Sequence, residues 1–200
     1  MVGLAVALVL FLAPLAYSPG PGPGNLFFAA NGARFGFRAT LLANLGYHAA
    51  TWCVTLAIGF GFLGVIEAAP QVFGALKFAG AAYVLWLASK LVRTGLLGSG
   101  AEARPARFWD GAMLLLLNPK AYVIIALMFT QFLGGAEDGQ LALVFLIATI
   151  FTLNNYVAFT VWTTLGDALA QRFRNPDSAR WLNIGFGGML AVVALWMVLV

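Results

Sequence analysis

The sequence Ser18-Pro19-Gly20-Pro21-Gly22-Pro23-Gly24-Asn25 interrupts an apolar stretch near the N-terminus, and no continuous helix can contain it. Proline removes a backbone donor and glycine has little helical preference, so carbonyls and amides are freed there. A second interruption, Asn118-Pro119-Lys120, falls in another apolar stretch. At membrane depth, non-helical backbone survives only where protein buries it or where it lines a polar cavity. The two breaks therefore predict a path through the protein.

The composition predicts a membrane protein. The 200 residues are 62% hydrophobic and 9% charged, against about 45–50% and about 25% in soluble domains. One domain, residues 1–200, is the natural count at this length. We expect an all-α polytopic bundle embedded in a lipid bilayer, and the net charge of +4 carries no indication of nucleic acid.

Six apolar stretches are each long enough to cross a hydrocarbon core of about 30 Å. They cover residues 2–33, 39–66, 72–92, 108–133, 141–165 and 181–200. Lys and Arg gather in the first, third and fifth connections. In the second and fourth connections, all the charged residues are acidic. The positive-inside rule then places the odd connections in the cytoplasm and both termini outside. A cleaved secretory signal is an alternative for the N-terminus, but a basic n-region is lacking.

The third connection, residues 94–107, divides the chain into two halves of three predicted crossings each, residues 1–95 and 108–200. An odd number of crossings forces two homologous halves into opposite orientations, as in inverted-repeat transporters. Each half has its break in its first helix. The expected architecture is therefore six transmembrane helices as two inverted three-helix repeats, with helices 1 and 4 broken.

The second helix of each half has a polar face. In the first half Asn44 and His48 start a stripe at helical spacing that Thr51, Thr55 and Gly59 continue. In the second half Asn155 accompanies a stripe made of Thr152, Tyr156, Thr160 and Thr163. Polar groups in a bilayer turn toward other helices or a cavity. Bonds between helices and contacts with a solute are equally good readings of the threonines.

Lys120 is predicted to lie about 18 Å inside the membrane, counting about 1.5 Å per residue from Phe108. An unpaired ammonium there costs about 2.5–3.5 kcal/mol, so a compensating partner is expected. A carboxylate of the solute and the freed groups at the breaks, including the amides of Asn25 and Asn118, are candidates. Lys77 lies only about 8 Å inside its helix and can reach the interface by snorkelling.

Two residues are candidates for proton coupling besides Lys77. His48, the single histidine, has the chemistry of a proton carrier, although a hydrogen-bonded histidine packed between helices is an equally good reading. Asp110 lies near the start of the fourth stretch, where it can exchange protons or merely offset the positive helix terminus.

Several chemistries are excluded by the residues present. One cysteine, Cys53, and one histidine cannot form a disulfide or a soft-metal site. The chain has no P-loop and no Gly-x-Ser-x-Gly nucleophile elbow. We therefore expect no cofactor, no metal and no enzymatic activity; a non-transporting membrane subunit remains a third reading.

Three blocks resemble the lysine exporter superfamily, the amino-acid efflux proteins of LysE and RhtB type. The Pro-Gly-Pro run of residues 19–21, continued by Gly22, is similar to the motif of the first family helix. The block Leu76-Lys-Phe-Ala-Gly-Ala-Ala-Tyr83 is similar to the motif of the third, and Leu117-Asn-Pro-Lys120 with Gln131-Phe132 to that of the fourth. The resemblance implies a bacterial inner-membrane exporter of amino acids, driven by the proton motive force and oligomeric.

The chain departs from the family pattern at the second and fifth helices. Asn155 stands where family members often have an acid, and Asn44 and His48 stand where small residues are common. The loss of an intramembrane acid argues for a neutral zwitterion, whose carboxylate could meet Lys120 or amides freed at Pro119 and Asn118. An exporter or channel for another small solute or cation is the alternative.

Overall fold

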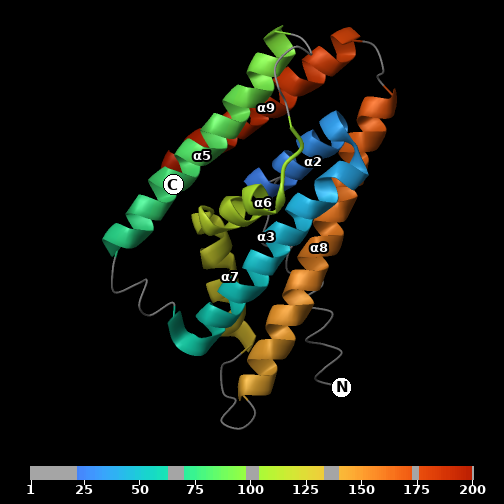
Figure 1. Cartoon of the computed structure of the whole chain (residues 1–200). Helices are drawn as coiled ribbons and strands as arrows, with labels where there is room; N and C mark the ends of the chain where they lie inside the picture. The colour runs from blue at the N-terminus through green and yellow to red at the C-terminus, as the bar shows by residue number, and fades with distance from the viewer. Residues whose placement is uncertain (1–21, 63–69, 98–103, 133–139, 173–175, 200) are drawn as a thin grey trace.

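The computed structural model describes residues 22–62, 70–97, 104–132, 140–172 and 176–199. In these ranges the ordered elements are all helical (Figure 1), which confirms the predicted all-α class. The helices are α2 (Pro23–Phe35), α3 (Phe37–Ala57), the π-helix η1 (Ile58–Phe62), α5 (Pro70–Leu97), α6 (Phe108–Leu116), α7 (Pro119–Phe132), α8 (Gln140–Arg172) and α9 (Pro176–Leu199).

Two pairs of long helices form the frame of the molecule. Helix α5 packs along α9, and α3 packs along α8 (Figure 1). The short helices α2 and α6 lie between the two pairs: α2 contacts α8, α9 and α3, and α6 contacts α3 and α5. The interior of the bundle is therefore occupied by short helices next to chain breaks.

Glycine allows the closest approaches of these helices. A Cβ at Gly32 of α2 would collide with the backbone of Thr163 on α8, and one at Gly166 with the backbone of Ala29. Between α3 and α6 the pairs Gly46–Phe108 and Gly111–Ala43 show the same relation. Without a hydrophobic force between helices in lipid, such small-residue contacts are a main source of association.

The structure confirms part of the predicted topology. Four helical segments are long and apolar enough to cross a membrane: Phe37–Gly61, Gly74–Arg93, Leu141–Arg172 and Arg180–Leu199. The pair Phe108–Leu116 and Pro119–Phe129 makes a fifth crossing if it is one bent span. The first half of the first expected crossing lies outside the described residues.

The break in the second half is where the sequence predicts it. Helices α6 and α7 are bent by 66°, and Leu117 and Asn118 are the residues outside both. The expected extent needs correction, because Pro119 begins α7 and Lys120 already lies in that helix. Proline is favoured at the first helical position, where its missing N–H is not needed.

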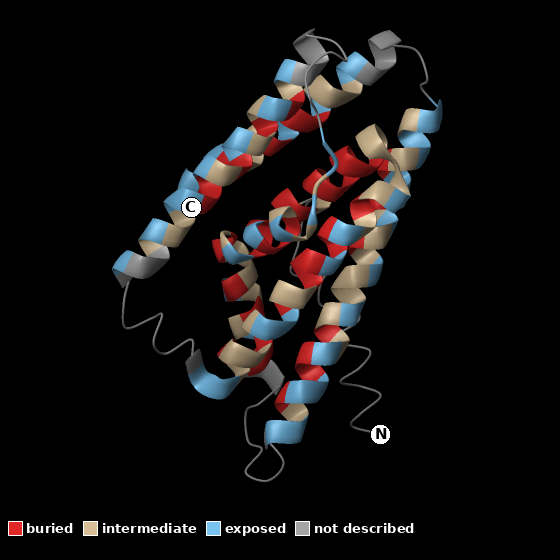
Figure 2. Cartoon of the chain, viewed as in Figure 1, coloured by how far each residue is buried: buried red, intermediate tan, exposed pale blue. Residues whose placement is uncertain are grey.

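The first break needs the same correction. Gly22, in extended conformation, precedes a helix that begins at Pro23, so Asn25 lies inside α2 and not in the break. Pro19, Gly20 and Pro21 lie outside the described residues. Helix α2 is buried almost throughout (Figure 2), so the segment after this break is an interior helix.

Candidate functional site

The polar faces of α3 and α8 meet along an antiparallel interface. Three contacts fix the register: the backbone N–H of Phe37 donates to Asp167 Oδ2 at 3.1 Å, Asn44 Nδ2 donates to Thr160 Oγ1 at 3.1 Å, and the rings of His48 and Tyr156 lie 5.3 Å apart. The predicted polar stripe on α3 is buried, since Asn44, His48, Thr51 and Thr55 all have low exposure.

Most threonine hydroxyls in this region bond to their own helix. Each donates to the carbonyl of the residue four positions earlier, as Thr51 does to Tyr47 at 2.9 Å. The others are Thr40, Thr55, Thr163 and Thr164. Thr160 is different, because its hydroxyl accepts from Asn44. Of the two readings of the threonines, bonding between helices therefore holds at Thr160.

Four buried side-chain atoms in the described part of the chain have no hydrogen-bond partner. They are Asn44 Oδ1, His48 Nε2, Asn118 Oδ1 and Thr152 Oγ1. Three of these residues are more than nine-tenths buried: Asn44 is 1% exposed, His48 4% and Asn118 7%. A buried polar group without a partner costs about 1–3 kcal/mol, so these four atoms are groups that a ligand or water could still satisfy.

Three of the four atoms follow the α3–α8 interface. His48 is one helical turn from Asn44 on α3, and Thr152 is one turn from Tyr156, the α8 residue that contacts His48. One turn is about 5.4 Å. The unpaired atoms are thus spaced along the helix axes, as groups in a path for a polar solute would be.

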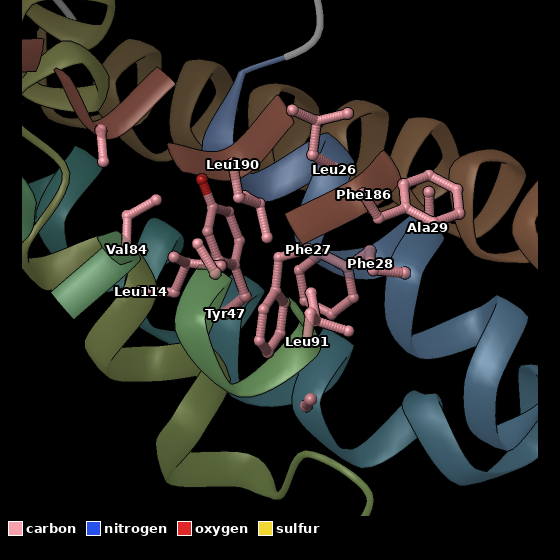
Figure 3. Close-up of a cluster of buried hydrophobic side chains, with 14 of the residues drawn as sticks. Leu26, Phe27, Phe28, Ala29, Tyr47, Val84, Leu91, Leu114, Phe186 and Leu190 are labelled. Atoms are coloured by element: carbon pink, nitrogen blue, oxygen red, sulfur yellow. The ribbon is translucent and has the colours of Figure 1, made fainter. Parts of the chain in front are cut away.

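Aromatic rings surround His48. Tyr47, Tyr156 and Phe159 have centroids 5.1, 5.3 and 5.2 Å from the imidazole, and Phe28 of α2 contacts Phe159 at 5.2 Å. Tyr47 also belongs to the apolar cluster of the interior, where it lies between Leu114 and Phe27 in the view of Figure 3. The line of unpaired polar atoms along α3 and α8, called the polar track from here on, is thus bordered by aromatic and apolar groups.

Asn118 connects the break between α6 and α7 to this region. Its side chain lies close to the Tyr47 hydroxyl, while its Oδ1 stays unpaired. Gly80 of α5 lies against the backbone of Leu117, where a Cβ would collide. Glycine in the block of residues 76–83 is therefore required for α5 to pack against the break.

The predicted cationic residues lie elsewhere. Lys120 Nζ is 5.6 Å from the centroid of Trp196 on α9, and the residue is half-buried. Lys77 is half-buried on α5. Neither side chain has a contact with the unpaired atoms among those described. The expected carboxylate partner for Lys120 stays a prediction.

Asp110 acts as a helix cap. Its Oδ2 accepts from the backbone N–H of Arg107 at 2.7 Å and from Arg104 at 3.0 Å, and the Tyr83 hydroxyl donates to its carbonyl. These contacts match the helix-terminus reading of Asp110. Asn155 donates its amide to the carbonyl of Phe151 in its own helix, while its backbone carbonyl faces His48.

Sequence reasoning missed Tyr47, Phe159 and Asp167. The first two are large aromatic residues beside a polar stripe, and nothing in their spacing separates them from lipid-facing aromatics. Asp167 is a carboxylate two residues after the fifth apolar stretch, 141–165, and its place at the end of that stretch is a signal for a helix-terminus contact. It binds the first amide of α3, after Gly36 with its positive φ of 83°.

The described residues contain no cluster of His, Cys, Asp and Glu that could hold a metal ion. The broken helix, the buried polar track and the membrane-length helices define a polytopic helical membrane protein with a line of polar groups in its interior. The chain belongs to the LysE type translocator family, whose family model matches residues 15–199.

Curated relatives match over nearly the whole chain at low identity. An uncharacterized membrane protein of Vibrio cholerae is 28% identical, over 92% of each chain. The homoserine/homoserine lactone efflux protein of Salmonella typhimurium is 26% identical, over 90% of this chain and 88% of its own. The leucine efflux protein of an Enterobacter species is 24% identical, over 86% and 84% respectively. No solved structure matches the chain.

Proposed function

We propose that this protein is a secondary transporter that exports amino acids or close derivatives across the bacterial inner membrane. The observation that carries the proposal is the track of unpaired polar atoms between α3 and α8, next to the α6–α7 break. In a family of translocators, a desolvated track of this kind is where a polar solute would exchange its water for protein groups. Coupling to the proton motive force is part of the proposal.

The names of the relatives support a substrate with an amino group. Leucine, homoserine and homoserine lactone differ in their side chains, and the lactone has no free carboxylate, but all three have an α-amino group. The relatives bearing these names are 24% and 26% identical to this chain, so the class of substrate carries over and the particular amino acid does not.

The proposed topology is six crossings in two inverted repeats, with both termini outside. The pairing of α5 with α9 and of α3 with α8 supports it, because each pair joins corresponding helices of the two expected halves. In an inverted repeat such pairs lie next to the pseudo-twofold axis in the membrane plane. Single-cysteine labelling from either side of the membrane tests the orientation.

Efflux from cells loaded with dipeptides tests the function. Intracellular peptidases release the amino acid, and a strain deleted for its own exporters should excrete leucine or homoserine faster when it produces this protein. An uncoupler should remove the difference if the transport depends on the proton motive force. Equal excretion with and without the protein, over a panel of single amino acids, would contradict the proposal.

Lys120→Ala tests the predicted role of the lysine at the second break. We expect efflux to be lost while membrane insertion stays normal, because the substrate carboxylate would lose its cationic partner. Lys120→Arg, which keeps the charge, is the matched control and should retain part of the activity. Unchanged efflux in Lys120→Ala would remove Lys120 from the mechanism and leave it as a cation over the ring of Trp196.

A further inference from the structure

The chemistry of the unpaired atoms around His48 restricts what can bind there. His48 Nδ1 lies 2.8 Å from the backbone carbonyl of Asn44. A carbonyl only accepts, and Nδ1 is the ring nitrogen with a carbonyl within hydrogen-bond distance, so we assign the proton of the neutral ring to Nδ1, which leaves a lone pair on Nε2. Nε2 is without a partner. The track therefore offers an acceptor, and not a donor, at the level of His48.

The neighbouring unpaired atoms are acceptors as well. Asn44 uses its Nδ2 on Thr160, which leaves Oδ1 free, and Asn118 has its Oδ1 free. Carbonyl oxygens and an imidazole lone pair bind N–H donors. A carboxylate is also an acceptor, so these atoms would repel it.

Aromatic rings around His48 favour the same kind of ligand. Tyr47, Tyr156 and Phe159 border the imidazole, the last two at interplanar angles of 80°, and a wall of rings excludes water, which strengthens the attraction between a cation and nearby acceptors. Acceptors without a formal negative charge, bordered by aromatic rings, suit an ammonium group with three N–H donors. They hold it without the desolvation cost of a buried carboxylate.

We propose that Asn44 Oδ1 and His48 Nε2, with Asn118 Oδ1 further along the track, bind the ammonium group of the exported solute, and that a proton entering at His48 Nε2 displaces it. The inference rests on the proposed function and names the group that the site recognises. Protonation turns Nε2 from an acceptor into a donor and makes the ring a cation, which repels the ammonium. One positive charge leaves as one arrives, so the site exchanges solute for proton.

A hydrogen-bond acceptor for the protonated Nε2 lies beside the ring. The backbone carbonyl of Asn155 on α8 faces the ring, so Nε2–H could donate to it. The titratable groups in contact with His48 are the phenols of Tyr47 on its own helix and Tyr156 on α8. Among the described residues no carboxylate, lysine or arginine contacts the ring, so the charge state of the site depends on the ligand and on His48.

Binding to the full-length protein in lipid nanodiscs tests the proposal, with L-leucine and L-homoserine as probes. Their deaminated analogues, 4-methylpentanoate and 4-hydroxybutyrate, keep the carboxylate and the side chain. We expect the amino acids to bind at pH 8 and to bind progressively more weakly as the pH falls below 5, and the analogues not to bind. Equal binding of the analogues would overturn the ammonium assignment.

Three variants separate the acceptor role from the titration. His48→Gln keeps an acceptor that cannot be protonated, so it should bind at pH 8 and lose the dependence on pH. His48→Leu and Asn44→Leu should each weaken binding about tenfold, the effect of losing a hydrogen bond to a charged group. Asn31→Leu is the matched control, because the buried Asn31 already donates to Phe27 of its own helix. A pH dependence that persists in His48→Gln would overturn the exchange.

The outcomes distinguish this inference from the function on which it rests. If the wild-type protein neither binds nor exports any amino acid, both fail. If it exports amino acids and His48→Leu and Asn44→Leu bind and export as well as the wild type, only the ammonium site fails. His48→Gln, which changes shape little, keeps the test decisive even if a leucine variant does not fold.

Discussion

Helices α2 and α7, which follow the two breaks in the chain, both pack against α8 but in different ways. Helix α2 meets the second half of α8 backbone to backbone, through Gly32 and Gly166. Helix α7 shares a cluster of buried side chains with the first half of α8, in which Ile125, Met128 and Phe129 lie together with residues such as Ile147. One face of α7 is exposed, whereas α2 is buried almost throughout (Figure 2).

The difference shows what each contact tolerates. A backbone contact through glycine has no room for another atom, and it is lost when a side chain is added. A side-chain contact responds to lost volume, because a void deprives its lining of dispersion partners. The polar track lies beside α2 at its aromatic end, where a Cβ on Gly24 would lie 2.8 Å from the ring of Phe159. Helix α2 therefore borders the candidate site.

The largest effect is expected for Gly32→Leu. The added side chain would meet the backbone of Thr163, which cannot move aside as a flexible side chain can. Repacking of side chains cannot relieve a clash with backbone, so the substitution would separate α2 from α8. We expect little or no monodisperse protein in size-exclusion chromatography after detergent extraction.

Gly188→Leu is the matched control, since no atom lies within 4 Å of a Cβ at that exposed position of α9. It should extract like the wild type. If Gly32→Leu extracted equally well, α2 would not be held by its backbone, and the contrast with α7 would disappear.

A smaller effect is expected for Ile125→Ala in α7. Ile125 is 1% exposed, in the cluster that joins α7 to α8 and η1. Truncation of such a buried side chain costs about 2–5 kcal/mol. The protein should still assemble, with a lower midpoint of thermal unfolding in detergent. Val123→Ala, on the exposed face of α7, should leave the midpoint almost unchanged, and equal losses in both variants would contradict side-chain packing at this contact.

The smallest effect is expected for Asp167→Ala, at the corner where α2 turns into α3. Its carboxylate accepts from the first amide of α3 at 3.1 Å, and loss of such a cap costs about 1 kcal/mol. Hydrogen exchange measured on peptides that include Phe37 should become faster, with little change elsewhere. Asp110→Ala provides the comparison, because it removes the equivalent cap from α6. Unchanged exchange near Phe37 would show that Gly36 alone holds the corner.

The sequence predicted features that depend on local chemistry. Asn118 and Pro119 mark the bend of the fourth expected span because proline cannot continue a helix. The buried stripe from Asn44 to Thr55 follows from helical spacing in an apolar segment. The boundaries were displaced by two or three residues where Pro23 and Pro119 start helices instead of ending them.

Other features depend on how distant segments pack, and a single sequence contains no signal for them. The approach of Asn118 to Tyr47 and the pairing of Asn44 with Thr160 join residues far apart in the chain. The position of Lys120 Nζ beside Trp196 of α9 also depends on distant packing, whereas the expected contact of Lys120 with a solute stays a prediction.

The threonines of α3 and α8 have a mechanical consequence. Thr51 and Thr55 of α3 and Thr163 of α8 donate to carbonyls of their own helices. A bond inside one helix travels with that helix, so it does not break when α8 slides or tilts against α3. Among the described residues, few hydrogen bonds join a side chain of α3 to a side chain of α8. The one nearest His48 is the bond between Asn44 and Thr160. The interface between α3 and α8 is buried and contains many polar residues, yet few of its hydrogen bonds would oppose a rocking movement of one helix against the other.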